Sequence, residues 1–182
     1  MLNTLPNILT AFRIGLIPVM VFAFYTNSTW GKWASLFIFI FASITDFLDG
    51  YLARAWSQTS KLGEFLDPVA DKLLVASTLF LLAGFDQISH FALMPAIVIL
   101  CREILVSGLR EFLGEMNVHT PVSKFAKWKT AVQMISISLL LLGSVPDIGK
   151  FVLNTGEALL WIAAVMTLVT GYDYIKASSR YL

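Results

Sequence analysis

Long apolar runs alternate with short polar segments along this chain. Six apolar segments can be drawn: Leu5–Tyr25, Trp33–Leu52, Val69–Phe85, Phe91–Leu109, Thr130–Val145 and Leu153–Tyr174. A helix needs about 17–25 residues to cross about 30 Å of hydrocarbon, so the shorter segments must borrow flanking residues. Inside lipid, only helices and closed barrels satisfy their own backbone hydrogen bonds. The pattern therefore predicts an all-α, polytopic membrane protein with six transmembrane helices.

The composition supports a membrane protein. Of the 182 residues, 57% are hydrophobic and only 14% are charged, which is too little charge to cover a soluble domain of this length. We expect a single membrane domain over residues 1–182, surrounded by membrane lipids. A net charge of +1 gives no reason to expect a nucleic-acid partner. The single cysteine, Cys101, excludes a disulfide within one chain.

The basic residues predict the orientation, because lysine and arginine concentrate in cytoplasmic loops. If both termini lie in the cytoplasm, only Lys32 and Lys150 lie on the opposite side. The cytoplasmic set is then Arg54, Lys61, Arg110, Lys124, Lys127, Lys129, Lys176 and Arg180. The sequence therefore predicts that the N- and C-termini are both inside.

Four aspartates flank the connection between the second and third apolar segments. Asp46 and Asp49 are three residues apart, and Asp67 and Asp71 are four apart, so each pair shares one helix face. Two carboxylates about 5–6 Å apart repel by about 3 kcal/mol at an effective dielectric near 20. Either some of them are protonated or a cation joins them. Hard oxygen ligands favour Mg²⁺ or Mn²⁺, and four carboxylates can hold two such ions, which suits in-line displacement at phosphorus.

Small and basic residues follow the first aspartate pair. Gly50 and Ala53 share the face of Asp46 and leave a trough where a bulky ligand can approach the backbone. Arg54 offers a positively charged fork for phosphate oxygens. The alternative for the two small residues is that they only permit close packing of helices.

The spacing of these residues resembles a family signature. The string Asp-x₂-Asp-Gly-x₂-Ala-Arg-x₈-Gly-x₃-Asp-x₃-Asp, which runs from Asp46 to Asp71, is similar to that of the CDP-alcohol phosphatidyltransferase family and matches it without a departure. The resemblance implies that the four aspartates bind two divalent cations that bridge the pyrophosphate of a CDP-lipid. It also implies that Asp71 is the general base for the acceptor hydroxyl. The residues that would line the CDP part of the site are Asp49, Gly50, Ala53, Arg54 and Gly63.

A polar stripe runs along the first apolar segment. Asn7, Thr10 and Arg13 recur every three residues on an otherwise apolar helix. An arginine there is costly unless it faces a polar pocket or reaches the membrane interface. The stripe is similar to the opening Pro-Asn-x-Leu-Thr-x-x-Arg of the same family, and this resemblance implies a place beside the nucleotide.

A second group of basic residues is a candidate binding site for the alcohol that accepts the phosphatidyl group. Arg110, Lys124, Lys127 and Lys129 lie around the fourth and fifth apolar segments, and converging basic groups suit a dianionic phosphate. Attraction to anionic lipid headgroups is the alternative, and the Arg102–Glu103 pair can be a structural ion pair. The segments around Arg110 and Lys127 resemble the family members that transfer a phosphatidyl group from CDP-diacylglycerol to sn-glycerol 3-phosphate. Arg110 and Lys127 are the first candidates for its phosphate.

The resemblance also implies a homodimer in the bacterial inner (cytoplasmic) membrane, with its active site facing the cytoplasm.

Other interpretations of the function stay open. The acceptor can be serine, inositol phosphate or phosphatidylglycerol in the same chemistry. A small cation-binding transporter would carry acidic or broken segments in two related halves, and no second copy of the aspartate motif is present. A non-catalytic scaffold would not need the complete aspartate set.

Overall fold

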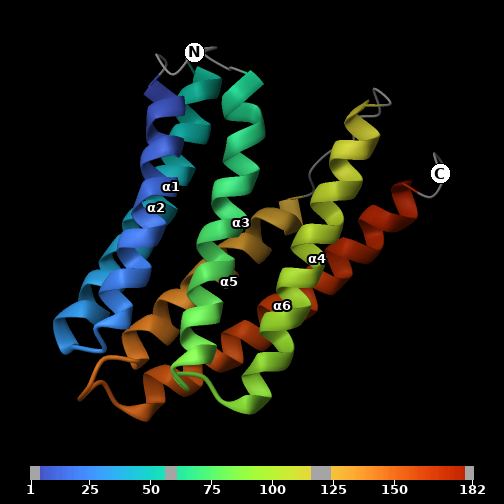
Figure 1. The fold of residues 1–182 in the computed structure, drawn as a ribbon. Coiled ribbons are helices and arrows are strands. Elements are labelled where there is room, and N and C mark those ends of the chain that lie inside the picture. The colour runs from blue at the N-terminus through green and yellow to red at the C-terminus, as the bar shows by residue number, and fades with distance from the viewer. Residues whose placement is uncertain (1–4, 56–60, 116–123, 179–182) are drawn as a thin grey trace. The chain divides into compact units, whose positions relative to one another are not determined.

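The computed structural model describes residues 5–55, 61–115 and 124–178. Within these ranges the chain is helical, with no strand. The helices are α1 (Leu5–Tyr25), α2 (Thr29–Ala55), α3 (Lys61–Gly84), α4 (His90–Glu115), α5 (Lys124–Gly143) and α6 (Lys150–Ser178) (Figure 1). The prediction of an all-α fold is confirmed.

Several helices extend beyond the apolar segments drawn from the sequence. Helix α2 ends at Ala55 rather than Leu52, and α3 begins at Lys61 rather than Val69. Hydropathy marks only the part of a helix that is apolar enough to lie in hydrocarbon, whereas the helical backbone hydrogen bonds continue into more polar sequence. As a result, Asp67 and Asp71 both lie within a helix.

Three of the described helices contain a stretch that is long and apolar enough to cross a membrane. These stretches are Ile8–Tyr25, His90–Gly114 and Lys150–Lys176. Large apolar side chains are nevertheless exposed on every described helix, for example Phe22, Phe37, Phe80, Ile104, Ile135 and Val165. Such extensive exposure is unusual for a water-soluble monomer. The chain is therefore a membrane protein.

The chain forms two compact units. Unit one comprises Met1–Gln87 with Leu141–Gly149, and unit two comprises Ile88–Leu140 with Lys150–Leu182. In unit one, α1 packs along both α2 and α3, which contact each other far less (Figure 1). Helix α1 is therefore the element through which α2 and α3 are connected.

The core of unit one converges on Met20 of α1, which is fully buried. Ser35 of α2 donates a hydrogen bond to its carbonyl oxygen at 3.1 Å, and the Thr78 hydroxyl of α3 lies 3.6 Å from its sulfur. Gly31 allows a tight turn into α2, because a Cβ there would lie 2.2 Å from the Ala23 carbonyl oxygen. These contacts fix the rotation of α1 against both of its neighbours.

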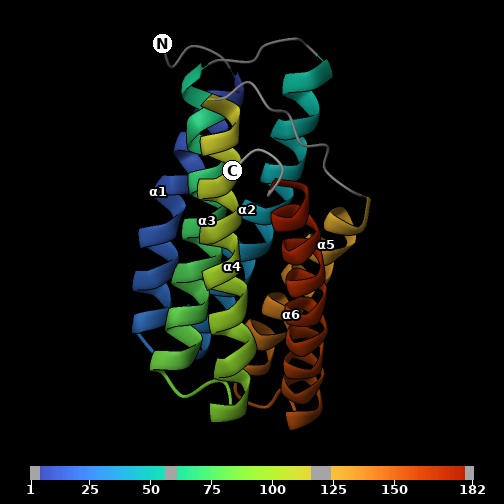
Figure 2. The ribbon, with the colours of Figure 1, turned by 90° about the vertical axis from the view of Figure 1, so that its right-hand side faces the viewer.

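In unit two, α4 packs along α6, and the Ser136 hydroxyl of α5 donates to the Gly156 carbonyl of α6 at 2.8 Å (Figure 2). Glu157 of α6 accepts hydrogen bonds from the Ser89 backbone N–H at 2.6 Å and from its hydroxyl at 2.8 Å. A carboxylate just before α4 also complements the positive end of the helix dipole. Helix α6 is thus bonded to α5 and to the residue that precedes α4.

Candidate active site

Two polar side chains of α1 bind the aspartates of the neighbouring helices. The Thr10 hydroxyl donates to Asp67 Oδ1 of α3 at 2.5 Å, and Arg13 Nη1 forms a short ion pair with Asp46 Oδ1 of α2. Thr10 and Arg13 are one helical turn apart and both are 0% exposed. Helix α1 therefore holds a carboxylate from each of two helices that contact each other little.

The other described members of the signature lie on α3. Asp71 follows Asp67 by one turn and is partly buried, as Asp46 and Asp67 are. Gly63 is buried in the first turn of the same helix. The α1 beginning, the α2 end and the α3 beginning lie together at one end of unit one (Figure 1). The structure thus brings three of the four predicted aspartates to one end of one unit.

Six predicted site residues have side chains outside those that the structure describes. They are Asn7, Asp49, Gly50, Ala53, Arg54 and Lys124. The backbone at all six positions is helical, and the roles assigned to these side chains stay predictions.

The donor set at this end of unit one fits a hard divalent cation in its chemistry. Asp46, Asp67 and Asp71 offer only carboxylate oxygens, the ligands that suit Mg²⁺ and Mn²⁺. Asp46 and Asp67 are bound by Arg13 and Thr10, which are one turn apart on α1, so both carboxylates face the same stretch of that helix. Among the side chains that the structure describes, no three acidic, histidine or cysteine residues gather closely enough to form a metal site. The side chain of the fourth aspartate, Asp49, lies outside that set.

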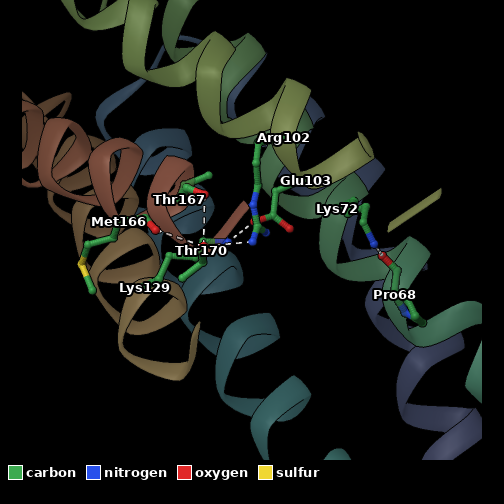
Figure 3. Close-up of polar contacts among 8 residues, drawn as sticks. All are labelled: Pro68, Lys72, Arg102, Glu103, Lys129, Met166, Thr167 and Thr170. Atoms are coloured by element: carbon green, nitrogen blue, oxygen red, sulfur yellow. Dashed lines mark hydrogen bonds and ion pairs between the residues drawn. The ribbon is translucent and has the colours of Figure 1, made fainter. Parts of the chain in front are cut away.

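A partly buried charged cluster joins the helices of unit two (Figure 3). Glu103 of α4 forms a short ion pair with Lys129 of α5, and its Oε1 lies 3.6 Å from Arg102 Nη1. Arg102 Nη2 donates to the Thr170 hydroxyl of α6 at 2.9 Å. Gly171 makes room for this arginine, because a Cβ there would lie 3.1 Å from its Cγ and Nε atoms. This Arg102–Glu103–Lys129–Thr170 cluster therefore connects all three helices.

The predicted phosphate-binding residues differ in their surroundings. Lys129 is only 5% exposed and its ammonium is engaged by Glu103. Arg110 and Lys127 are exposed, and the Arg110 guanidinium lies 5.9 Å from the centroid of the Tyr174 ring. A cation over an aromatic face gains a modest electrostatic attraction. Arg110 and Lys127 thus have the accessibility that a phosphate ligand requires.

Two features of the site were missed by reasoning from the sequence. The pairing of Thr10 and Arg13 with aspartates was not predicted, and neither was the pairing of Glu103 with Lys129. Arg13 and Asp46 are 33 residues apart, and Glu103 and Lys129 are 26 apart. The sequence did give one signal. A charge within a membrane helix is costly unless it has a partner, but the sequence does not show which residue that partner is.

Helices that expose apolar side chains, together with aspartates from two helices held by a third, define a membrane protein with an acidic site. The chain belongs to the CDP-alcohol phosphatidyltransferase family, whose model matches residues 3–169. The family resemblance seen in the aspartate signature is thereby confirmed.

Curated relatives match almost the whole chain. A Rickettsia bellii protein is 46% identical over 98% of this chain and 97% of its own length, and a Rickettsia felis protein is 45% identical over the same shares. An Escherichia coli K12 protein is 41% identical over 96% of this chain and 94% of its own. Each of the three is named CDP-diacylglycerol–glycerol-3-phosphate 3-phosphatidyltransferase.

Proposed function

We propose that this enzyme transfers the phosphatidyl group of CDP-diacylglycerol to sn-glycerol 3-phosphate, giving phosphatidylglycerophosphate and CMP. The observation that carries the proposal is the complete aspartate signature, from Asp46 to Asp71, in a chain that matches enzymes of this name almost from end to end. The hydrogen bonds from α1 to Asp46 and Asp67 support it further, because they hold carboxylates of two helices at one site.

In the proposed reaction, the acceptor hydroxyl oxygen forms a bond to the lipid-side phosphorus, and the bond from that phosphorus to the CMP oxygen breaks. Asp71 accepts the proton of the attacking hydroxyl, because an alcohol is a poor nucleophile at neutral pH. Asp46, Asp49, Asp67 and Asp71 are the proposed ligands of two Mg²⁺ or Mn²⁺ ions. When bound, such ions neutralise charge on the pyrophosphate and on the departing CMP.

The CDP-lipid is proposed to bind beside the aspartates. The residues assigned to it are Asn7, Thr10, Arg13, Asp49, Gly50, Ala53, Arg54 and Gly63. Thr10 and Arg13 support this assignment because they already contact Asp67 and Asp46. A pyrophosphate bridged to those carboxylates would lie next to the same face of α1.

The acceptor phosphate is proposed to bind Arg110 and Lys127, which are exposed basic residues of unit two. Lys124 and Lys129 are the further candidates. For Lys129, the ion pair with Glu103 favours a supporting role, in which its charge acts on the phosphate from a buried position. A guanidinium supplies paired donors that match phosphate geometry.

The proposed setting is the bacterial inner membrane, with six spans, both termini inside and the site facing the cytoplasm, in a homodimer. Exposed apolar side chains on every described helix support six lipid-facing helices. Single cysteines introduced near Lys32 and near Arg180, in a chain whose Cys101 is replaced by serine, test the orientation through their labelling in intact cells by a membrane-impermeant maleimide. Only the cysteine near Lys32 should be labelled.

The function is tested by measuring CMP release from CDP-diacylglycerol with each acceptor in turn. We expect turnover with sn-glycerol 3-phosphate, its loss on chelation of divalent cations and its recovery on adding Mg²⁺ or Mn²⁺. Serine, inositol phosphate and phosphatidylglycerol should give little product. Turnover that requires one of these three and does not occur with glycerol 3-phosphate would overturn the acceptor assignment. Full turnover after chelation would overturn the metal mechanism.

A further inference from the structure

Arg13 places a fixed positive charge inside the aspartate site. Its side chain is 0% exposed and forms an ion pair with Asp46. A buried cation is costly unless it is paired, so the packing of α1 and α2 keeps the guanidinium beside this carboxylate. Salt screens a partly buried charge pair much less than an exposed one.

The second donor of α1 provides a contrast. Thr10 holds Asp67 with a neutral hydroxyl, which orients the carboxylate and brings no charge. Arg13 orients Asp46 and also neutralises it. The two residues therefore affect the charge of the site differently, although both reach it from the same helix face.

A divalent cation on Asp46 would lie within a few ångströms of the Arg13 guanidinium. Two positive charges at that separation repel strongly in a medium of low dielectric. Arg13 therefore weakens cation binding while it relieves the repulsion among the carboxylates. Four carboxylates and two divalent cations cancel in charge, so Arg13 adds a positive charge to the loaded site, beside that of Arg54, for an anionic pyrophosphate.

We propose that Arg13 is an internal counter-charge of the aspartate site, a positioning residue that lowers the affinity for divalent cations and raises the affinity for the CDP-lipid. The inference rests on the proposed function of the aspartates as metal ligands. It distinguishes Arg13 from a simple structural residue, because loss of a structural contact would weaken the binding of both ligands together.

The test uses the full chain, purified in detergent, with Mn²⁺ as the probe. Free Mn²⁺ is measured by electron paramagnetic resonance during titration, and the KM for CDP-diacylglycerol is measured at saturating Mn²⁺. For Arg13→Met we expect the Kd for Mn²⁺ to fall about tenfold and the KM for the lipid to rise. Arg13→Lys keeps the charge, so its Kd for Mn²⁺ should stay much closer to that of the unsubstituted protein than the Kd of Arg13→Met does.

Lys32→Met is the matched control. Lys32 is also a buried cation of unit one, at 8% exposed, and it lies 14 residues before Asp46 on the same helix, about 21 Å along its axis. Removing its charge should leave Mn²⁺ affinity unchanged. A similar gain in affinity in both methionine variants would show a general effect of net charge and would overturn the inference.

A second comparison covers the case in which Arg13→Met does not fold. Asp46→Asn alone is compared with Asp46→Asn combined with Arg13→Met, which removes both charges of the partly buried pair. The remaining aspartates should bind Mn²⁺ more tightly in the double variant, because repulsion by Arg13 acts over distance.

Unchanged or weaker Mn²⁺ binding in Arg13→Met, or in the double variant relative to Asp46→Asn, would overturn this inference and leave the proposed function intact. Failure of the unsubstituted protein to bind Mn²⁺ at all would overturn the metal-dependent function and the inference together.

Discussion

Each of the two units has a partly buried ion pair between helices, but the roles of the partners are reversed. In unit one, Asp46 belongs to the predicted reactive set and Arg13 supports it. In unit two, Lys129 belongs to the predicted phosphate-binding set and Glu103 supports it. The same kind of ion pair therefore occurs in a site with excess negative charge in one unit and in a cluster with excess positive charge in the other.

This difference shows how the chain accommodates charge within apolar helices. A buried ion pair contributes little net stability because desolvation offsets the attraction, yet removing one partner leaves an uncompensated charge. Each supporting residue thus allows its partner, a predicted functional residue, to stay charged between apolar helices. The comparison can be tested by removing a functional residue and a supporting residue in each unit.

The largest effect is expected for Asp71→Asn in unit one. The amide cannot accept the hydroxyl proton or neutralise a divalent cation as a carboxylate does, so CMP release should fall at least about 1,000-fold. The protein should remain folded, with a thermal unfolding midpoint close to that of the unsubstituted chain. Asp86→Asn is the control, because Asp86 is exposed and its positive φ of 53° suits asparagine. Activity near the original level in Asp71→Asn would refute its assignment as the base.

The next effect is a loss of stability in unit two. Glu103→Gln leaves Lys129 and Arg102 without their carboxylate, and the free energy of unfolding should fall by about 3 kcal/mol. Thermal unfolding in detergent measures it, with the exposed Glu111→Gln on the same helix as the control. Adding Lys129→Met should recover part of the loss. If the double variant is less stable than Glu103→Gln, the supporting role of Glu103 is wrong.

A smaller effect is expected on substrate affinity in unit two. Arg110→Ala removes a charged donor from the proposed phosphate site, so the KM for glycerol 3-phosphate should rise about 30-fold. The KM for CDP-diacylglycerol should stay the same. Lys150→Ala, another exposed basic residue, is the matched control. An equal rise for both substrates would assign Arg110 to general folding or membrane attachment.

The smallest effect is expected for Thr10→Val in unit one. Valine has a similar shape and lacks the donor to Asp67, so CMP release should fall about tenfold through a less ordered carboxylate. Thr155→Val removes a hydroxyl that bonds within its own helix, to the Phe151 carbonyl, and should have no effect. An unchanged rate in Thr10→Val would mean that packing alone holds Asp67 in place.

Much of the fold followed from local pattern. Apolar runs predicted six helices, and the structure has a helix at each of these positions. The helix ends were less accurate, as at Lys61, where α3 begins eight residues before the predicted Val69. Hydropathy reports the match to lipid, and it does not mark where the backbone hydrogen bonds end. Six spans and the orientation stay predictions, because three described helices meet the criterion for crossing a membrane.

The sequence by itself determined the family and predicted which carboxylates react, because a signature of fixed local spacing encodes which side chains share a helix face. Only the tertiary structure decided that Arg13 pairs with Asp46, that Thr10 donates to Asp67 and that Glu103 pairs with Lys129. These partners are 26 to 57 residues apart. Their pairing depends on how each helix is rotated against its neighbours, and that rotation is set by the packing of whole helix faces rather than by local sequence.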